Sequence, residues 1–257
     1  MQAEMTDGLV SIVVPVHNAG AYIEKTIESV KAQTYTEWEL ILVNDNSEDD
    51  SREKILNCIK EDEEQIRLID ILGTNAGAAQ ARNRGIEASG GRYIAFLDAD
   101  DIWMSDKLEK ELAFMKEKEA GFVFSAYEFG DENGAGTGRV VSVPEELIYK
   151  RALSRTVIFT STVLIDKRRI EKQLIRMPDV KSEDTATWWQ IMRAGHTAYG
   201  LNEVLTIYRR PAKSLSSNKA EAVRRIWNLY RRREGLPFFY SVYNLFFWAV
   251  RASLRRI

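Results

Sequence analysis

The sequence is poor in cysteine and contains no long apolar run. Its 257 residues include one cysteine, Cys58, which excludes an intramolecular disulfide framework and a cysteine-rich metal site. No apolar run reaches the roughly 18 residues of a membrane-spanning helix, so none is predicted. Residues 1–20 lack a basic segment followed by an apolar one, and we expect no secretory signal. A single cysteine is in keeping with a reducing compartment.

Repeats, low-complexity segments and linkers rich in proline or serine are also missing, while charge is unevenly distributed. Apolar residues make up 45% of the chain and charged residues 29%, which excludes the disordered and fibrous classes. In total, 36 Lys and Arg oppose 38 Asp and Glu, but residues 209–257 hold 12 of the bases and two of the acids. This split predicts an acidic catalytic body followed by a tail with an anionic partner.

Strand and helix patterns alternate through the first hundred residues. Short apolar runs rich in β-branched residues predict buried strands, and helical periodicity lies between them. The predicted strands are 9–16, 38–43, 66–72 and 93–97, and the predicted helices are 21–33, 51–59 and 77–88. This order predicts an α/β fold with right-handed crossovers and a mostly parallel central sheet flanked by helices. Ligands of such sheets bind beyond the carboxyl ends of the strands.

The pattern changes after residue 120. We predict strands at 121–129 and 161–165, a glycine-rich turn or loop at 131–138, a helix at 183–193 and a strand pair within 199–208. The simplest organisation is one mixed α/β domain, residues 1–215, followed by a basic, aromatic, amphipathic helical tail, residues 216–257.

Three carboxylates directly follow the fourth predicted strand, at Asp98, Asp100 and Asp101. Packing does not explain them, because unpaired buried carboxylates are costly. A hard divalent cation, Mg²⁺ or Mn²⁺, would, since it takes oxygen ligands and shares them with phosphates. The alternative is a solvated strand end that caps the next helix. The pattern favours a metal and nucleotide site.

Three further motifs allow both a functional and a structural interpretation. Asp45, after the second strand, could accept a hydrogen bond from a base or a sugar, or form an Asx turn. Residues 75–85 open a helix with small side chains, which suits close approach of an anion or tight packing on the sheet. Glu183 and Asp184 begin a helix, where they suit its dipole or supply a general base for an acceptor hydroxyl.

Together and in this order, the motifs resemble the family 2 glycosyltransferases, which have the GT-A nucleotide-diphospho-sugar transferase fold. The resemblance covers about residues 9–215 and rests on VSIVVPVHNAGAYIEKTIESVKAQTYTEWELILVNDNS, NAGAAQARNRGI, YIAFLDADD and SEDTATWW. The stretches TSTVLID, RMPDVKSEDTATWWQI and YRRPAKSLSSNK are similar to bacterial enzymes of teichuronic-acid, capsule or O-antigen synthesis.

The resemblance implies roles for the residues on the donor side. Pro15 and Asp45 match the positions that line the nucleotide-base pocket. Asp98 matches the aspartate that faces the ribose, and Asp100 matches the ligand of the metal that bridges the diphosphate. The implied cofactor is Mg²⁺ or Mn²⁺, and the implied donor is a nucleotide-diphospho-sugar, with UDP as the default nucleotide.

The resemblance also implies an inverting transfer to a lipid-linked or growing cell-surface polysaccharide acceptor. Arg82 and Asn83 match the family's donor-side helix. Asp184 matches the general base, and Glu183 stands beside it. Both are therefore the expected catalytic residues.

Two other classes of protein remain alternatives. A sugar nucleotidyltransferase shares the sheet and the metal chemistry, but we expect a glycine-rich loop with Arg or Lys after its first strand, and residues 16–20 contain neither base. A non-catalytic nucleotide-sugar-binding protein would not need Asp184. The two histidines, His17 and His196, are expected to be structural.

The tail contains an apolar, aromatic segment at 236–250, which is too short to span about 30 Å of hydrocarbon. Its apolar side chains at helical spacing are Phe239, Tyr243, Phe246, Val250 and Leu254. The arginines that flank it are Arg224, Arg225, Arg231–Arg233, Arg251, Arg255 and Arg256. Such a helix lies in a membrane interface. We expect peripheral attachment to the cytoplasmic face of the bacterial inner membrane, with an anionic surface and not nucleic acid as partner. The alternative is packing on the body or on a second subunit.

Overall fold

A central ten-stranded sheet runs through the computed structural model, which describes residues 5–60, 64–73, 76–209 and 219–254. Its strands are β1 (Thr6–Val16), β2 (Trp38–Asp45), β3 (Ile66–Ile71), β4 (Gly91–Phe96), β5 (Ile102–Trp103), β6 (Phe122–Gly130), β7 (Gly136–Val141), β8 (Glu146–Leu147), β9 (Val163–Asp166) and β10 (Ala198–Arg209). The α-helices are α1 (Ile23–Lys31), α2 (Ser51–Ile59), α3 (Ala78–Ala88), α4 (Lys107–Glu117), α5 (Tyr149–Ala152), α6 (Lys172–Ile175), α7 (Glu183–Arg193), α8 (Lys219–Asn228) and α9 (Phe238–Leu254). A 3₁₀ turn spans Thr160–Thr162, and a π-helical turn, η3, spans Leu229–Arg233.

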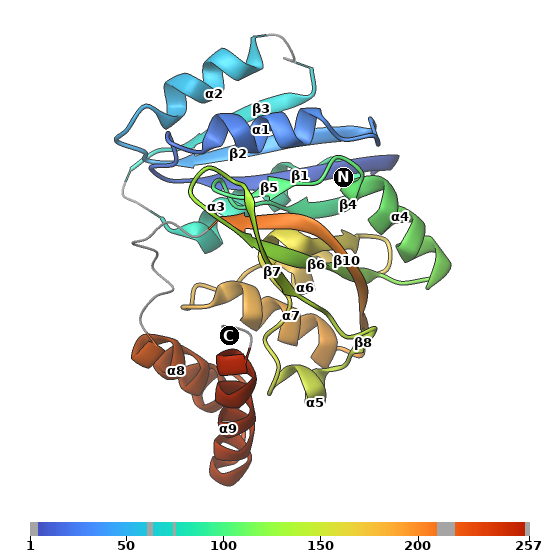
Figure 1. Ribbon diagram of the computed structural model, residues 1–257, viewed down its shortest axis with the longest axis vertical. Helices are drawn as coiled ribbons and strands as arrows, with labels where there is room; N and C mark the ends of the chain where they lie inside the picture. Colours follow the sequence, from blue (N-terminus) through green and yellow to red (C-terminus); the bar gives the residue numbers. More distant parts are fainter. Residues whose placement is uncertain (1–4, 61–63, 74–75, 210–218, 255–257) are drawn as a thin grey trace.

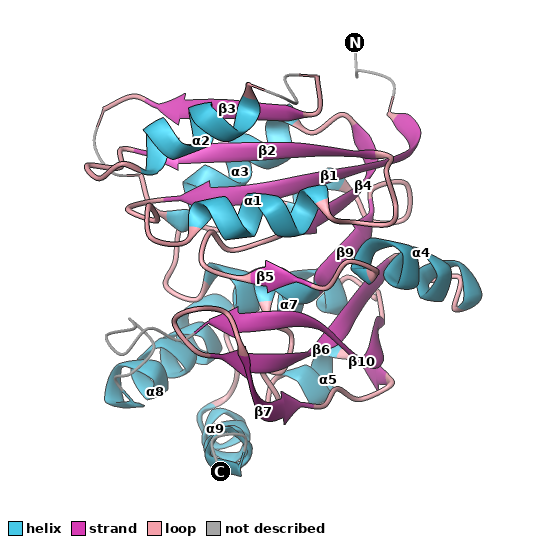
Figure 2. Ribbon diagram, turned by 45° about the horizontal axis from the view of Figure 1, so that its top comes forward, coloured by secondary structure: helices cyan, strands magenta, loops and turns pink. Residues whose placement is uncertain are grey.

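The first half of the chain confirms the predicted alternation of strands and helices. Strands β3, β2, β1 and β4 lie side by side in that order and are parallel. Helices α1 and α2 cover one face of this part of the sheet, and α3 covers the other (Figure 2). Because parallel strands end at the same edge, the loops that follow β1, β2 and β4 meet there.

Side chains on both faces of β1 are buried in hydrophobic cores. Val13 packs with Phe96 in the core on the α3 side, while Val14 packs with Ile27 in the core on the α1 side. Helix α3 approaches β1 closely at Gly85, where a Cβ atom would lie 2.3 Å from a methyl carbon of Val13. The small residues in this helix therefore serve tight helix–sheet packing, as one of the two interpretations proposed.

The second half of the sheet is mixed, and two predictions there are wrong. Strand β9 is antiparallel to both β4 and β6, and β10 is parallel to β6. Residues 199–208 do not form a strand pair, because they belong to the single strand β10, which is bent by register shifts between Leu201 and Thr206. The loop expected at 131–138 ends early, because β7 starts at Gly136 and forms a hairpin with β6. Helix α4 was not among the predicted elements.

The tail helices pack against the body through one face. Tyr230 stacks on Trp189 of α7 with ring centroids 5.4 Å apart, and the Trp248 indole donates a 2.7 Å hydrogen bond to Thr156 Oγ1. Figure 1 shows α8 and α9 together at the end of the molecule away from α2. Within the described ranges, no helix is both long and apolar enough to cross a membrane. The predicted boundary at 215/216, Arg255 and Arg256 lie outside the described residues.

Candidate functional site

A cavity of about 460 Å³ opens at the sheet edge where β1, β2 and β4 end. It is lined by Pro15, Val16, His17, Asn18, Ala19, Tyr22, Asp45, Gly77, Ala78, Ala81, Asp98, Ala99 and Asp100. Four of the predicted donor-site residues, Pro15, Asp45, Asp98 and Asp100, therefore share one cavity. Their strands and loops are far apart in the sequence, and the parallel sheet brings them together.

The acidic loop that follows β4 carries Asp98, Asp100 and Asp101, and these three carboxylates have different environments. Asp100 is half-buried, and burial together with the nearby Asp98 raises the pKa of its carboxyl to about 6. Asp101 is fully buried outside this cavity, where it accepts hydrogen bonds from Ser161 Oγ at 2.5 Å and from the Arg209 backbone N–H at 3.2 Å. Asp101 thus stabilises the loop, while Asp98 and Asp100 face the cavity.

The two cavity carboxylates fit a divalent cation that arrives with a diphosphate. Asp100 forms no ion pair with any residue in the described ranges, and its pKa is raised first by burial and then by the nearby Asp98 carboxylate. The described residues contain no group of three or more His, Cys, Asp or Glu side chains able to hold a metal by themselves. Mg²⁺ is commonly bound by one or two carboxylates plus substrate phosphates, so the remaining ligands would come from the nucleotide and water.

Arg82 links the donor cavity to the start of α7. Its Nη2 atom lies 2.6 Å from Asp98 Oδ1, and its Nη1 atom lies 2.7 Å from Glu183 Oε1. The side chain is 7% exposed, so it needs both carboxylates to compensate its burial. The guanidinium of Arg82 therefore joins three of the predicted motifs. These are residues 75–85, the acidic loop and the start of α7.

Asp184 lies beside this network, at the start of α7. Its Oδ1 atom accepts a 2.6 Å hydrogen bond from the Thr185 N–H, and Thr160 Oγ1 donates to Oδ2 at 3.3 Å. Burial and the adjacent Glu183 carboxylate raise the pKa of Asp184. Ser182, the residue before the helix, has a left-handed backbone with φ 64°, a strained conformation that is common at functional sites.

Two other predicted residues have structural partners. Asp45 accepts hydrogen bonds from the backbone N–H groups of Ala76 at 2.8 Å and Gly77 at 2.7 Å, so it fixes the approach to α3 within the cavity wall. Asn83 exchanges two 2.8 Å hydrogen bonds with the backbone of Met177. The structure does not bring Asn83 to the donor cavity, because its amide holds the segment that leads toward α7.

The histidines have separate surroundings. His17 lies in the cavity wall with Nδ1 2.7 Å from the Asp45 carbonyl oxygen. His196 lies elsewhere, 3.6 Å from Glu171.

Arg209 is a residue that sequence reasoning missed. It is 1% exposed, its Nε atom donates to the Asp100 carbonyl, and its Nη2 atom donates to Tyr22 O at 3.2 Å and Thr26 Oγ1 at 3.0 Å. It therefore fastens the acidic loop to α1 from the end of β10. The available signal was a charged residue directly after the apolar run VLTIY, the same signal that identified Asp98.

We expect Arg209→Met to loosen the acidic loop. The substitution keeps most of the side-chain volume but leaves the Asp100 and Tyr22 carbonyls without their donor, which should cost about 2–4 kcal/mol of unfolding free energy. Urea unfolding measures this loss. Arg168→Met, at a position that is 46% exposed, is the control and should change stability by less than about 0.5 kcal/mol. Equal stability of both variants would contradict the role given to Arg209.

Comparisons with known proteins identify the family of the chain. A family model described as Glycosyl transferase family 2 matches residues 11–173. The "Putative teichuronic acid biosynthesis glycosyltransferase TuaG" of Bacillus subtilis is 40% identical over 250 residues, which cover 97% of this chain and 98% of that protein. The UDP-Glc:alpha-D-GlcNAc-diphosphoundecaprenol beta-1,3-glucosyltransferase WfgD of Escherichia coli is 34% identical over 229 residues, 88% of this chain and 86% of that protein.

Solved structures share the fold at low sequence identity. Residues 1–349 of S. aureus TarS in complex with UDP-GlcNAc superpose with a TM-score of 0.70 and 18% identity, covering 93% of this chain and 71% of that chain. The mannosyltransferase PcManGT from Pyrobaculum calidifontis, in complex with GDP-Man and Mn²⁺, gives a TM-score of 0.67 and 18% identity, covering 89% and 65%. At this identity the likeness concerns the fold alone.

Proposed function

Because the chain belongs to glycosyltransferase family 2 and has the GT-A fold, we propose that it transfers a sugar with inversion from a nucleotide-diphospho-sugar to a hydroxyl group. The acceptor of this proposal is a lipid-linked or growing cell-surface polysaccharide. The observation that carries the proposal is the Arg82 network, which joins Asp98 on the donor side to Glu183, the neighbour of Asp184. A donor site and a candidate base therefore share one cluster.

The donor is a UDP-sugar in this proposal, and four residues of the cavity bind it. Pro15 and Asp45 line the part for the base, Asp98 faces the ribose, and Asp100 is the ligand of Mg²⁺ or Mn²⁺. The printed names of two similar proteins support UDP, because WfgD is named for UDP-Glc and TarS is in complex with UDP-GlcNAc. The Mn²⁺ complex of PcManGT supports a divalent cation.

The reaction is a single displacement. The acceptor oxygen attacks the anomeric carbon as the bond from that carbon to the diphosphate oxygen breaks, and Asp184 takes the hydroxyl proton. When bound, the cation stabilises the negative charge of the leaving diphosphate. Thr160 and the Thr185 N–H hold the Asp184 carboxylate in place. Attack opposite the leaving group inverts the configuration, so no enzyme nucleophile is required.

A screen of nucleotide sugars tests the proposal and separates it from the two alternatives. The protein is incubated with UDP-, GDP- and dTDP-sugars and Mn²⁺, with and without lipid extract from bacterial membranes. Release of a nucleoside diphosphate supports a transferase. In a separate incubation with a nucleoside triphosphate and a sugar phosphate, formation of pyrophosphate would support a nucleotidyltransferase. Binding of a nucleotide sugar without turnover, both with and without lipid extract, would support a binding protein.

We also propose that residues 216–257 form a tail that docks on the catalytic domain, residues 1–215, and attaches it to the cytoplasmic membrane surface. The outward face of α9 exposes large apolar side chains: Phe239 is 85% exposed, Phe246 63% and Tyr243 57%. The described tail also carries exposed arginines in α8 and η3, Arg224, Arg231 and Arg232. Apolar aromatics flanked by arginines suit the interface of an anionic membrane, and the name of WfgD refers to a lipid-linked acceptor.

Removing the two most exposed phenylalanines of α9 should weaken membrane binding without unfolding the protein. We expect Phe239→Ser combined with Phe246→Ser to lower partitioning to phosphatidylglycerol vesicles by about 10-fold or more, because both rings lose apolar burial. Sedimentation with vesicles at low salt measures this. Leu72→Ser removes an apolar side chain that is 91% exposed outside the tail and is the control. Failure of the wild-type protein to sediment would favour packing on a second copy, which light scattering would detect.

A further inference from the structure

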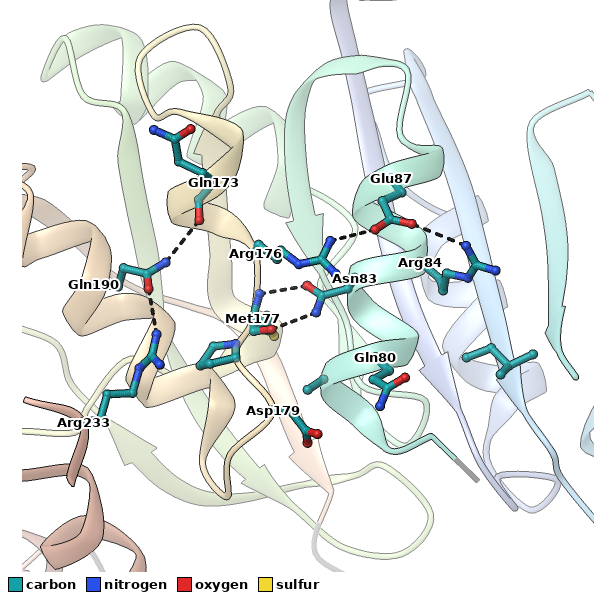
Figure 3. A pocket seen from close by; sticks show the side chains of 13 residues that line it. Gln80, Asn83, Arg84, Glu87, Gln173, Arg176, Met177, Asp179, Gln190 and Arg233 are labelled. Carbon is teal, nitrogen blue, oxygen red and sulfur yellow. Dashed lines mark hydrogen bonds and ion pairs between the residues drawn. The ribbon is translucent and has the colours of Figure 1, made fainter. Parts of the chain in front are cut away.

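A second and larger cavity, of about 730 Å³, lies on the other side of α3 from the donor cavity. Ala78 and Ala81 of α3 face the donor cavity, whereas Gln80 and Asn83 line the second one. Its other wall comes from the segment before α7, from α7 itself and from η3 (Figure 3). The lining is polar, and its charged residues are Arg84, Arg176, Arg233, Glu87 and Asp179.

Arg233 is held in this cavity in a fixed orientation. The Gln190 amide nitrogen donates to the carbonyl oxygens of Gln173 at 3.2 Å and Leu174 at 3.1 Å, so Gln190 Oε1 is free to accept from Arg233 Nη2 at 2.8 Å (Figure 3). The Nε atom of Arg233 has no hydrogen-bond partner among the described residues. A guanidinium carries five donors, and most of those of Arg233 are not committed to the protein.

The guanidinium groups of the cavity also outnumber its carboxylates. Glu87 is shared by Arg176, 2.7 Å away, and Arg84, 3.5 Å away. One carboxylate therefore compensates two arginines, and the cavity as a whole has three arginines against two acids. Arginine pairs with phosphate oxygens in a bidentate geometry, so this lining suits a phosphate ester.

The position of the cavity suits a phosphate that belongs to a lipid-linked acceptor. Asp184 and Gln190 lie on the same helix, six residues apart, which corresponds to about 9 Å along its axis. Arg233 ends the π-helical turn that leads into α9 and its exposed aromatic face. Along the protein, the candidate base Asp184 is thus followed by the second cavity, then by the basic turn η3, and then by the apolar helix α9. A lipid-linked acceptor has the same order: sugar hydroxyl, sugar, diphosphate, lipid chain.

We propose that this cavity binds the diphosphate of the lipid-linked acceptor, with Arg233 as its main protein ligand. The proposal rests on the proposed function, because it assumes that the acceptor is carried on a lipid. It assigns a role to Arg233 that neither the donor site nor the membrane contact requires.

Calorimetric titration of the full-length protein with farnesyl diphosphate tests the proposal. Saturating UDP and Mg²⁺ are present throughout, so that the donor cavity cannot bind the added diphosphate. We expect Arg233→Gln to weaken binding by about 10-fold or more, because it removes charge-assisted hydrogen bonds to phosphate. Arg232→Gln makes the same change at the neighbouring exposed position and should alter binding by less than about 2-fold.

Several outcomes would overturn the proposal. They are no binding of farnesyl diphosphate to the wild-type protein, equal losses in the two variants, equal binding of farnesol, and equally tight binding of inorganic pyrophosphate. Release of nucleoside diphosphate from the donor without acceptor should be unchanged in Arg233→Gln. If the wild-type protein releases none from any donor while the two variants still differ in binding, the proposed transfer fails and the diphosphate site stands.

Discussion

Replacing Asp184 by asparagine is expected to lower the rate of sugar transfer by about 10²–10⁴-fold, the usual contribution of a general base. Asparagine keeps the shape of the side chain and can still accept the hydrogen bond from the Thr185 N–H. The affinity for UDP, measured by calorimetry, should therefore stay nearly unchanged. A loss of rate without a loss of nucleotide affinity marks an interaction made in the transition state.

The pH profile gives a second measure of the same residue. A protonated carboxyl cannot take the acceptor proton, so the transfer rate should fall as pH decreases through the pKa of Asp184. Because burial and Glu183 raise that pKa, the fall should occur at a higher pH than for an ordinary aspartate. The residual activity of Asp184→Asn should lack this fall.

Glu183→Gln is the matched control for the base. Glu183 forms an ion pair with Arg82 at 2.7 Å, so its carboxylate is already committed to the network. We expect this variant to change the Michaelis constant for the donor more than the rate at saturation. If Glu183→Gln lost the rate while Asp184→Asn kept most of it, Glu183 would be the base.

Replacing Asp100 by asparagine should lower donor turnover by about 10²-fold or more, because it removes the proposed ligand of a cation that would stabilise the leaving diphosphate. The fold should be retained, since Asp100 forms no ion pair with the described residues and lies at the cavity surface. Binding of Mn²⁺ in the presence of UDP, followed by electron paramagnetic resonance, should weaken in parallel.

Asp101→Asn separates the cation site from the stability of the loop. Asp101 is fully buried and accepts hydrogen bonds from Ser161 and from the Arg209 backbone, so its substitution should lower the melting temperature. Asp100→Asn should leave the melting temperature nearly unchanged. Normal transfer by protein stripped with EDTA would rule out a cation at Asp100.

The order of elements in the first half of the chain could be predicted because each buried parallel strand is a short apolar run. The run at 38–43 is such a strand, whereas the run at 66–72 forms the partly buried edge strand β3, and each is followed by a helix with a polar face. Strand β10 could not be predicted as one strand, because its bend depends on pairing with β6, β5 and β8 at once. Pairing of this kind is set by tertiary contacts and has no local signature.

The sequence could predict the candidate site residues that directly follow strands. It could not predict residues whose hydrogen-bond partners belong to distant elements. Asp45, Asp98 and Asp100 stand at strand ends, so the topology alone places them together. The partners of Asn83 and Arg209 come from residues 94 and up to 187 positions away in the sequence. No sequence spacing connects such distant positions, so only the three-dimensional structure shows the roles of these two residues.

The stacking of Tyr230 on Trp189 places the tail and α7, the helix that carries Asp184, in one core. Exchanging tails between related enzymes would therefore break a contact on the inner side of α7. A working chimera has to carry the matching surface of α7 along with the tail. We expect the same coupling to make the tail and α7 vary together among related enzymes, because a change on one side of the contact has to be matched on the other.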